Sequence, residues 1–345
     1  MYKIDKHKLG DEEFTFIEVK QKDIEVTFMD FGATVMSILV PDKDGKKETV
    51  LLGYDKLSSY IDGEMFLNCI IGPTSGRIKD ATFNIDDSPY HIEKNFMETE
   101  NLHGGNDCLG YKFFDFEIID EEEQTQVIFK YHNLESGSNF PGNQLIQIAY
   151  TVRKTELKIE FMGDTTEPTI LNLSSHLYFN LSGNLKRQVL DNELSINADK
   201  TISLDSKFVP VKVVSLLNTH LDFNKSKVIK DVFTEDVYKR PEKGIDNPYL
   251  LNNVDYNKAQ ITLKDPISKR KLEVYTTYPC VVCYTHNFPD GLDLLFNRKH
   301  DKHLGICFET QNPPNGVNIE GLASSILREG EDYYHKTLYK FNVEK

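Results

Sequence analysis

The sequence has little that would support a disulfide framework or a membrane anchor. Its 345 residues include only five cysteines, an odd number that fits a reducing compartment. The N-terminus lacks the apolar core of a signal peptide, and no apolar run approaches the ~18 residues of a membrane span. Cys280 and Cys283 have the spacing of a redox motif, but in a β-rich run residues three apart point to opposite faces. We therefore expect a cytoplasmic protein with buried, inert thiols.

Positive charge is also scarce. Lys and Arg together number 40 against 54 Asp and Glu, which gives a formal net charge of −14. A negative surface repels the phosphate backbone of nucleic acids and anionic lipid headgroups. Hydrophobic residues make up 39% and charged residues 27% of the chain, as in ordinary globular proteins. We expect a globular monomer or homodimer with a small-molecule substrate, and neither nucleic acid nor membrane as a partner.

Several common catalytic motifs are missing from the sequence. It contains no Gly-x-Gly-x-x-Gly, no P-loop, no Gly-x-Ser-x-Gly and no His-Glu-x-x-His, so nucleotide binding, acyl transfer and zincin chemistry lose their usual support. The ten histidines are scattered without tight ligand spacing, and no second Cys-x-x-Cys completes a zinc site. The prediction is an activity without a cofactor or a bound metal.

What the sequence does contain is a long succession of strand signals. Short runs rich in β-branched and aromatic residues, such as Phe14–Val19 and Leu145–Arg153, recur along the chain. Helical periodicity is never sustained, and only Tyr54–Ile61 and Val228–Tyr238 suggest short helices. We find no linker and no internal repeat. The chain is expected to form an all-β fold, a large antiparallel β-sandwich with a few short helices, as one domain over residues 1–345.

The segment Asn172–Gly183 is the clearest alternating stretch. Its polar positions carry compact, uncharged groups with a histidine at the centre, whereas its apolar positions are Leu and Phe. The polar set is Asn172, Ser174, His176, Tyr178 and Asn180. This pattern predicts one half-buried strand, and its polar face is either an ordinary surface or a groove for a polyhydroxylated ligand.

Two carboxylates, Glu309 and Asp246, lie at positions where a catalytic or binding role has to be considered. Glu309 ends an apolar strand before Asn312–Gly316, where partial burial would raise its pKa and make it a useful base. The alternative is an exposed glutamate that protects an edge strand. Asp246 lies between Gly244 and an Asn-Pro pair, where most aspartates hydrogen-bond the local backbone of a turn.

These stretches together resemble one family, the aldose 1-epimerases, also called galactose mutarotases. The similarity is collinear from about residue 15 to the C-terminus. The segments that carry it are Gly76-Arg77-Ile78, Leu102-His103-Gly104-Gly105, Ser175–Leu181, Gly244–Asn247 and Glu309–Pro314. The resemblance implies a galactose-mutarotase-like supersandwich that interconverts the α and β anomers of free aldohexoses, such as galactose or glucose, at C1.

The sequence departs from the family pattern at several of these segments. Before Arg77 the family commonly has Tyr-Ala-Asn, where this chain has Thr74-Ser75-Gly76, and before His176 it has Asn in place of Ser175. The usual Trp after the His-Gly-Gly loop is also absent, because the chain has no Trp. The family resemblance then leaves Tyr178 or another ring to stack on the sugar. These changes affect the expected sugar preference more than the reaction.

The resemblance also implies roles for individual residues. Glu309 is the expected base and His176, protonated, the expected acid; the expected sugar-binding residues are His103, Arg77, Asp246 and Tyr178. Three other functions stay open at this point. They are an epimerase acting on phosphorylated hexoses or disaccharides, a non-catalytic carbohydrate-binding sandwich, and a glycoside hydrolase that would use Glu309 and Asp246 as its two carboxylates.

Overall fold

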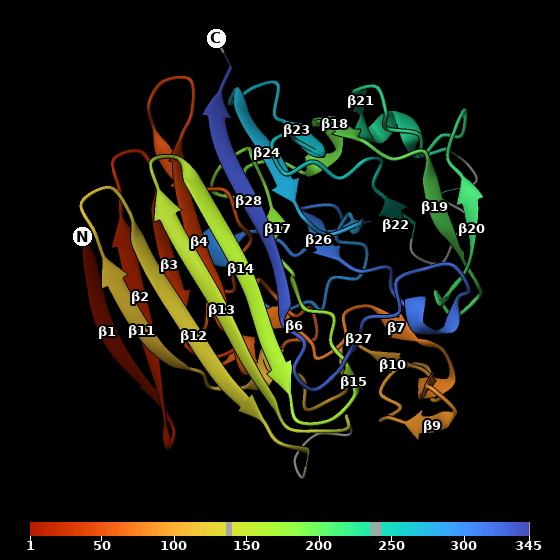
Figure 1. Ribbon diagram of the computed structural model, residues 1–345. Helices are drawn as coiled ribbons and strands as arrows, with labels where there is room; N and C mark the ends of the chain where they lie inside the picture. The colour runs from red at the N-terminus through yellow and green to blue at the C-terminus, as the bar shows by residue number, and fades with distance from the viewer. Residues whose placement is uncertain (136–139, 235–236, 238–242, 345) are drawn as a thin grey trace.

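A computed structural model of the protein describes residues 1–135, 140–234, 237 and 243–344. Every strand-to-strand ladder among them is antiparallel, in a fold with three larger sheets, which confirms the all-β prediction (Figure 1). The first sheet runs in chain order and consists of β1 (Tyr2–Leu9), β2 (Glu12–Lys20), β3 (Glu25–Met29), β4 (Thr34–Pro41) and β5 (Lys47–Thr49).

A nine-stranded sheet is the largest of the three. In spatial order it contains β11 (Asp115–Asp120), β12 (Thr125–Asn133), β13 (Gln144–Arg153), β14 (Glu156–Thr165), β28 (Tyr333–Val343), β24 (Arg270–Thr276), β23 (Ile261–Lys264), β18 (Glu193–Ile196) and β21 (Lys227–Val228). The C-terminal strand β28 pairs with both β14 and β24. It thereby joins segments that are far apart in the sequence.

The third sheet positions the candidate site. Its order is β17 (Tyr178–Phe179), β26 (Ile306–Gln311), β25 (Cys280–Tyr284), β22 (Asp246–Leu250), β19 (Lys200–Leu204) and β20 (Pro210–Ser215). Four two-stranded ladders complete the strands, namely β6 (Ile70–Ile71) with β16 (Ser174–Ser175), β7 (Arg77–Ile78) with β10 (Asn101–Leu102), β8 (Thr82–Ile85) with β9 (Ser88–His91) and β15 (Thr169–Ile170) with β27 (Ile326–Leu327).

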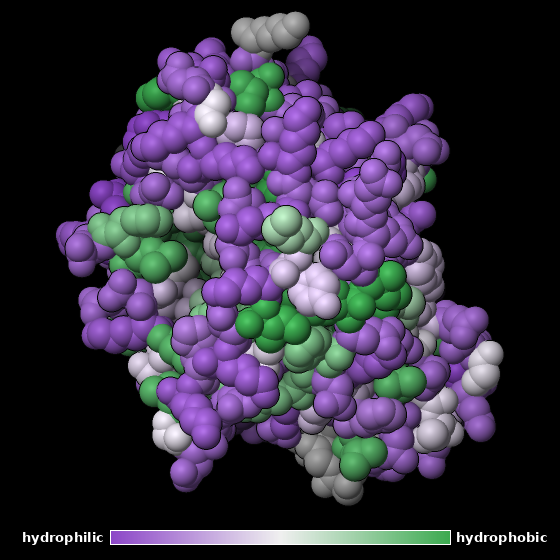
Figure 2. Space-filling model, turned by 90° about the vertical axis from the view of Figure 1, so that its left-hand side faces the viewer, coloured by the Kyte–Doolittle hydropathy of each residue, from purple (hydrophilic) through white to green (hydrophobic). Residues whose placement is uncertain are grey.

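Both smaller layers pack against the nine-stranded sheet. The Phe28 ring of β3 lies 4.9 Å from the Tyr150 ring of β13. On the same face of that sheet, the Phe179 ring of β17 lies 5.1 Å from the Tyr339 ring of β28. All four rings are buried, and burying such side chains away from water is the main stabilising contribution in a core. The side of the molecule on which β1 lies in Figure 1, turned toward the viewer in Figure 2, is mostly hydrophilic with smaller hydrophobic patches.

Helical structure is sparse. The helix expected within Tyr54–Ile61 is the single turn α1 (Ser59–Asp62). The helix expected over Val228–Tyr238 is a 3₁₀ turn at Ile229–Val232, and residues 235, 236 and 238 lie outside the described part. Other 3₁₀ turns are Lys79–Ala81, Leu109–Tyr111, Val189–Asp191, Leu295–Asn297 and Gly316–Asn318. In the ranges that the structure describes, no helix is long and apolar enough to cross a membrane.

The single strand predicted over Asn172–Gly183 is wrong. The segment forms two strands of two residues each, and they pair with different partners: β16 with β6, and β17 with β26. Both of its faces are buried, because the leucines enter the core while the polar side chains meet other loops and a cavity. Alternation therefore identified the two faces correctly, but the continuous strand that it predicted does not form.

Candidate active site

A cavity of about 670 Å³ lies beside the third sheet, and all six residues expected at a site line it. These are Arg77, His103, His176, Tyr178, Asp246 and Glu309. They come from three strands of the third sheet, from the segment between β16 and β17, from β7 and from the residue that follows β10. The fold therefore gathers side chains from five separate parts of the sequence at one opening.

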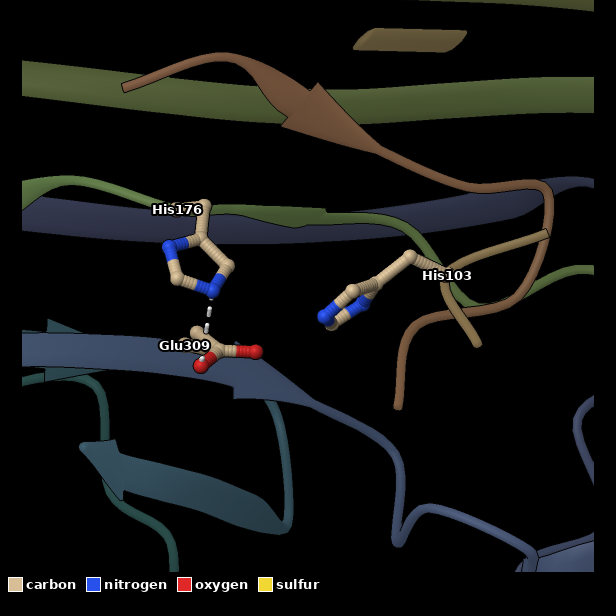
Figure 3. Close-up of side chains that lie close together, drawn as sticks. All are labelled: His103, His176 and Glu309. Atoms are coloured by element: carbon tan, nitrogen blue, oxygen red, sulfur yellow. Dashed lines mark ion pairs between the residues drawn. The ribbon is translucent and has the colours of Figure 1, made fainter. Parts of the chain in front are cut away.

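Strand register sets His176 against Glu309. Tyr178 is paired with Cys307 across the β17–β26 ladder, so continuing this antiparallel register places His176 opposite Glu309. Nε2 of His176 lies 3.4 Å from Oε1 of Glu309 (Figure 3). Glu309 is only 3% exposed, and its strand lies between β17 and β25. The alternative of an exposed glutamate on an edge strand is therefore wrong.

Burial changes the proton affinities of this pair in opposite directions. It raises the pKa of Glu309 to about 8, with the nearby Asp246 carboxylate adding to the rise and Arg77 opposing it. Burial lowers the pKa of His176 to about 4. Both shifts favour the neutral forms, so near neutral pH the pair holds one proton and Glu309 has the greater affinity for it. An ion pair, with an ionised Glu309 and a protonated His176, forms when this proton moves across the 3.4 Å contact.

His103 approaches the pair from the opposite side of the cavity, and Figure 3 shows its ring pointing toward the carboxylate. The β7–β10 ladder pairs Leu102 with Arg77, which places His103 at the end of a short strand. Its Nδ1 accepts a hydrogen bond of 3.2 Å from the backbone N–H of Gly76. Because that partner only donates, the neutral ring keeps its hydrogen on Nε2 and offers a donor to the cavity.

A glycine allows the His103 loop to lie this close to its neighbour. Gly104 has φ +96°, and an added Cβ would stand 2.5 Å from the backbone oxygen of Gly72. A larger residue would meet both backbone strain and a steric clash there. The His-Gly-Gly segment is therefore shaped by the close approach of its backbone to that of Gly72.

Arg77 and Asp246 form the far wall of the site. Nη2 of Arg77 lies 3.7 Å from Oδ2 of Asp246, with both side chains largely buried. Burial raises the pKa of Asp246, and Arg77 opposes this rise. The Arg77 guanidinium also lies over the rings of Phe96 and Phe208, 4.7 Å and 5.4 Å from their centroids. These contacts hold a cation and an anion in fixed positions, where they can bind hydroxyl groups.

Asp246 does not sit in a turn, as most aspartates in such a sequence would. It is the first residue of β22, where it pairs with Tyr284 of β25. The nearby glycine and proline favour a turn, and the local sequence gives no information about the partner strand. Pairing in the third sheet determines the structure here.

Tyr178 lines the cavity but lies mostly behind His176. Its ring is 2% exposed and lies 4.9 Å from the His176 ring. Its hydroxyl donates to the backbone oxygen of Met65 at 2.9 Å. Tyr178 thus supports the histidine, and stacking of this ring on a sugar remains a prediction.

Several residues at the cavity were not singled out from the sequence. Phe66 contacts His103, with ring centroids 4.9 Å apart, and Phe208, Phe288, Tyr111 and Asp290 also line the opening. They lie on loops without a recognisable motif, and no periodic pattern marks them. Pro289 and Asp290 belong to a segment whose composition predicts a turn, and this composition does not distinguish a functional position from an ordinary turn.

The side chains of His103, His176 and Glu309 each offer one possible metal-ligand atom, and these three atoms lie within 4.8 Å of one another. This spacing is close enough to consider a metal ion. A metal-binding histidine usually donates its second N–H to an acceptor, which frees the other nitrogen for the metal. His103 does the reverse, because its Nδ1 accepts from Gly76. The hydrogen on Nε2 suits an oxygen-bearing organic ligand better than a cation.

Comparison with known proteins places the chain among enzymes. The family model of aldose 1-epimerase matches residues 15–340. The chain belongs to the aldose 1-epimerase family. It is 30% identical to galactose mutarotase of Mus musculus, covering 94% of this chain and 93% of the relative. It is 29% identical to aldose 1-epimerase of Escherichia coli K12, covering 92% of each.

Solved structures of the family share the fold. An aldose epimerase homologue from C. elegans superposes with a TM-score of 0.87 at 25% identity, covering 96% of this chain and 99% of that one. Galactose 1-epimerase from Lactobacillus acidophilus gives a TM-score of 0.86 at 23% identity, covering 100% and 99%. The resemblance found in the sequence is confirmed by these comparisons.

Proposed function

We propose that the protein interconverts the α and β anomers of free aldohexoses, with Glu309 and His176 as the proton-transfer pair. The observation that carries this proposal is their geometry. A buried carboxylate and a buried imidazole lie 3.4 Å apart in a cavity, and a third group, His103, offers a donor beside them. Anomer exchange needs one base and one acid close to the same hemiacetal.

The reaction proceeds by opening and reclosing the sugar ring. Glu309 removes the proton from the C1 hydroxyl while His176 protonates the ring oxygen, so that the C1–O5 bond breaks and C1 becomes an aldehyde. Rotation about C1–C2 presents the other face of the carbonyl. The ring oxygen then attacks C1, returning its proton to His176, and Glu309 returns a proton to the C1 oxygen. The protein regains its starting protonation state.

The remaining groups bind the sugar. Arg77 and Asp246 hold ring hydroxyls at the far wall, where their mutual contact fixes both side chains. His103 donates from Nε2 to an oxygen near the reacting centre. Tyr178 keeps the His176 ring in place from behind.

The charges of the cavity favour a neutral sugar over a phosphorylated one. Of the described residues that line it, four are acidic, namely Glu64, Asp246, Asp290 and Glu309, whereas Arg77 is the only Lys or Arg. Arg77 is already close to Asp246. A phosphate dianion would meet repulsion here with little compensation.

Polarimetry on freshly dissolved α-D-galactose and α-D-glucose tests the function directly. We expect rotation to reach equilibrium much faster with the protein than without it. Glu309→Gln and His176→Asn should remain folded and show rates near background. Binding of sugar without faster anomer exchange would indicate a carbohydrate-binding module, and release of reducing sugar from a glycoside would indicate a hydrolase. Full activity in either variant would contradict the roles assigned to these residues.

A further inference from the structure

The two nitrogens of His176 face two residues of one strand. Nε2 faces Glu309 at 3.4 Å, and Nδ1 lies 3.6 Å from Sγ of Cys307. Cys307 and Glu309 are two residues apart on β26 and so project from the same face of the sheet. All three side chains are buried. Strand β26 therefore supplies both Glu309, which faces Nε2 of the imidazole, and Cys307, which lies at Nδ1.

The two histidines of the site differ in what lies behind them. Nδ1 of His103 meets a backbone N–H, which can only donate, so the hydrogen of the neutral ring stays on Nε2. Nδ1 of His176 meets a thiol, which can donate through its S–H or accept weakly through its sulfur. His103 is thus held in one state, whereas His176 can change its protonation without losing the contact at Nδ1.

The proposed reaction requires such a change. As an acid, His176 carries hydrogens on both nitrogens, and after it protonates the ring oxygen through Nε2 it keeps the hydrogen on Nδ1. That N–H needs an acceptor in a buried site. In the resting neutral form with the hydrogen on Nε2, Nδ1 becomes an acceptor and needs a donor. The thiol of Cys307 meets both needs by rotation of its S–H bond.

We propose that Cys307 is a positioning residue, which holds the His176 ring and keeps both of its protonation states available by exchanging donor and acceptor roles at Nδ1. The inference rests on the proposed function, since it assigns His176 a proton transfer. Sulfur is a weak acceptor, so it orients the imidazolium without stabilising it as a carboxylate would. The contact with sulfur therefore leaves the His176 imidazolium able to release its proton to the sugar.

The other groups around His176 leave this assignment clear. Burial raises the pKa of Cys307 well above its usual value, so the thiol keeps its hydrogen. Burial also lowers the pKa of His103 well below its usual value, with His176 and Arg77 adding to the effect. The remaining titratable neighbours are Tyr178, Tyr284 and His286, in which burial also favours the neutral form. Arg77 and Asp246 act on the pair through Glu309.

Three variants of Cys307 separate hydrogen bonding from packing. Cys307→Val keeps a similar volume but cannot hydrogen-bond, Cys307→Ala removes volume as well, and Cys307→Ser keeps a group that donates and accepts. We expect the Val and Ala variants to lose roughly tenfold in kcat, the change that corresponds to the loss of one hydrogen bond to the proton-transfer group. KM should stay near the wild-type value, the pH profile should shift, and Ser should restore most of the activity.

Cys283→Ala is the matched control. Cys283 is also buried, but it pairs with Phe308 on the adjacent strand and so faces the core instead of His176. Its substitution should leave kcat and the pH profile unchanged. An equal loss in the control, or a Cys307→Val variant with wild-type kcat and pH profile, would overturn the assignment.

NMR on ¹⁵N-histidine-labelled protein gives a readout that does not depend on activity. In the sugar-free protein we expect the Nδ1 resonance of His176, and its pH titration, to differ between wild type and Cys307→Val and to return in Cys307→Ser. Unchanged Nδ1 resonances would refute the hydrogen bond and with it the inference. If wild type exchanges no anomers while the NMR difference is present, the proposed function fails and the contact stands.

Discussion

Glu309→Gln should reduce activity and yet stabilise the protein at alkaline pH. Because the pKa of the buried carboxyl rises from 4.5 to about 8, the folded protein holds this proton more tightly than the unfolded chain. The stability contributed by the protonated carboxyl is fully present below pH 4.5 and is lost as the pH rises through about 8. Above that pH the wild type buries a charge that glutamine does not carry.

The size of the effect follows from the two pKa values. One pKa unit corresponds to about 1.4 kcal/mol, so the change from 4.5 to about 8 amounts to roughly 5 kcal/mol between the acidic and alkaline limits. The difference in unfolding free energy between Glu309→Gln and wild type should move in favour of the variant by up to this amount. The same variant should lose about 10²–10⁴-fold in kcat, the usual contribution of a proton-transfer group.

Urea unfolding at pH 5, 7 and 9 measures this difference. The chain has no Trp, so far-UV circular dichroism is a better probe than tryptophan fluorescence. Taking the difference between the two proteins at each pH cancels the titration of all other groups that they share. A difference that stays constant from pH 5 to pH 9 would refute the claim that burial controls Glu309.

Glu48 provides a matched control of opposite sign. It is also buried, but hydrogen bonds from Lys186 and Lys46 outweigh the effect of burial and lower its pKa to about 2. Its contribution to stability is present above pH 4.5 and is lost as the pH falls through about 2. Glu48→Gln should therefore destabilise the protein at pH 7 and 9, where Glu309→Gln gains.

Three further predictions concern the pH profile, the far wall and the His103 loop. Since the Glu309–His176 pair holds one exchangeable proton between about pH 4 and pH 8, kcat/KM should be bell-shaped and fall outside that range, with the two limits belonging to the pair; a flat profile from pH 5 to 10 would contradict this. Asp246→Asn should lower kcat/KM for galactose by roughly 10–100-fold, mainly through KM, because a charged hydrogen bond contributes about 1.5–3 kcal/mol; steady-state polarimetry with an unchanged KM would exclude its role in binding. Gly104→Ala should destabilise the fold by about 2 kcal/mol or more because of its clash with Gly72, measured by urea unfolding, whereas Gly291→Ala, also at positive φ but in open space, should cost less.

The strand-rich composition and the side-chain alternation were readable from the chain alone. Alternation depends only on the geometry of an extended backbone, so the polar and apolar faces around His176 were assigned correctly. The collinear motifs, from Arg77 to Glu309, identified the family and six of the residues that line the cavity. The preference of β-branched and aromatic residues for strands also excluded a helical fold.

Other features depended on partners far away in the sequence. The segment Asn172–Gly183 was expected as one strand, but β16 and β17 pair with different strands. Asp246 was expected in a turn and begins a strand, and Glu309 proved to be interior to its sheet. Local patterns contain no information about which strands meet, because pairing is decided by the packing of the whole chain.

The chemistry of the site shows this division most clearly. The sequence by itself led to the expectation that His176 and Glu309 act as acid and base, and its alternation put Cys307 and Glu309 on one face of a strand. Only the tertiary structure decided that β17 lies beside β26 in the register that sets His176 against Glu309, with Cys307 at its Nδ1. Burial and distance control proton affinity, and both arise from contacts between segments that no stretch of sequence contains.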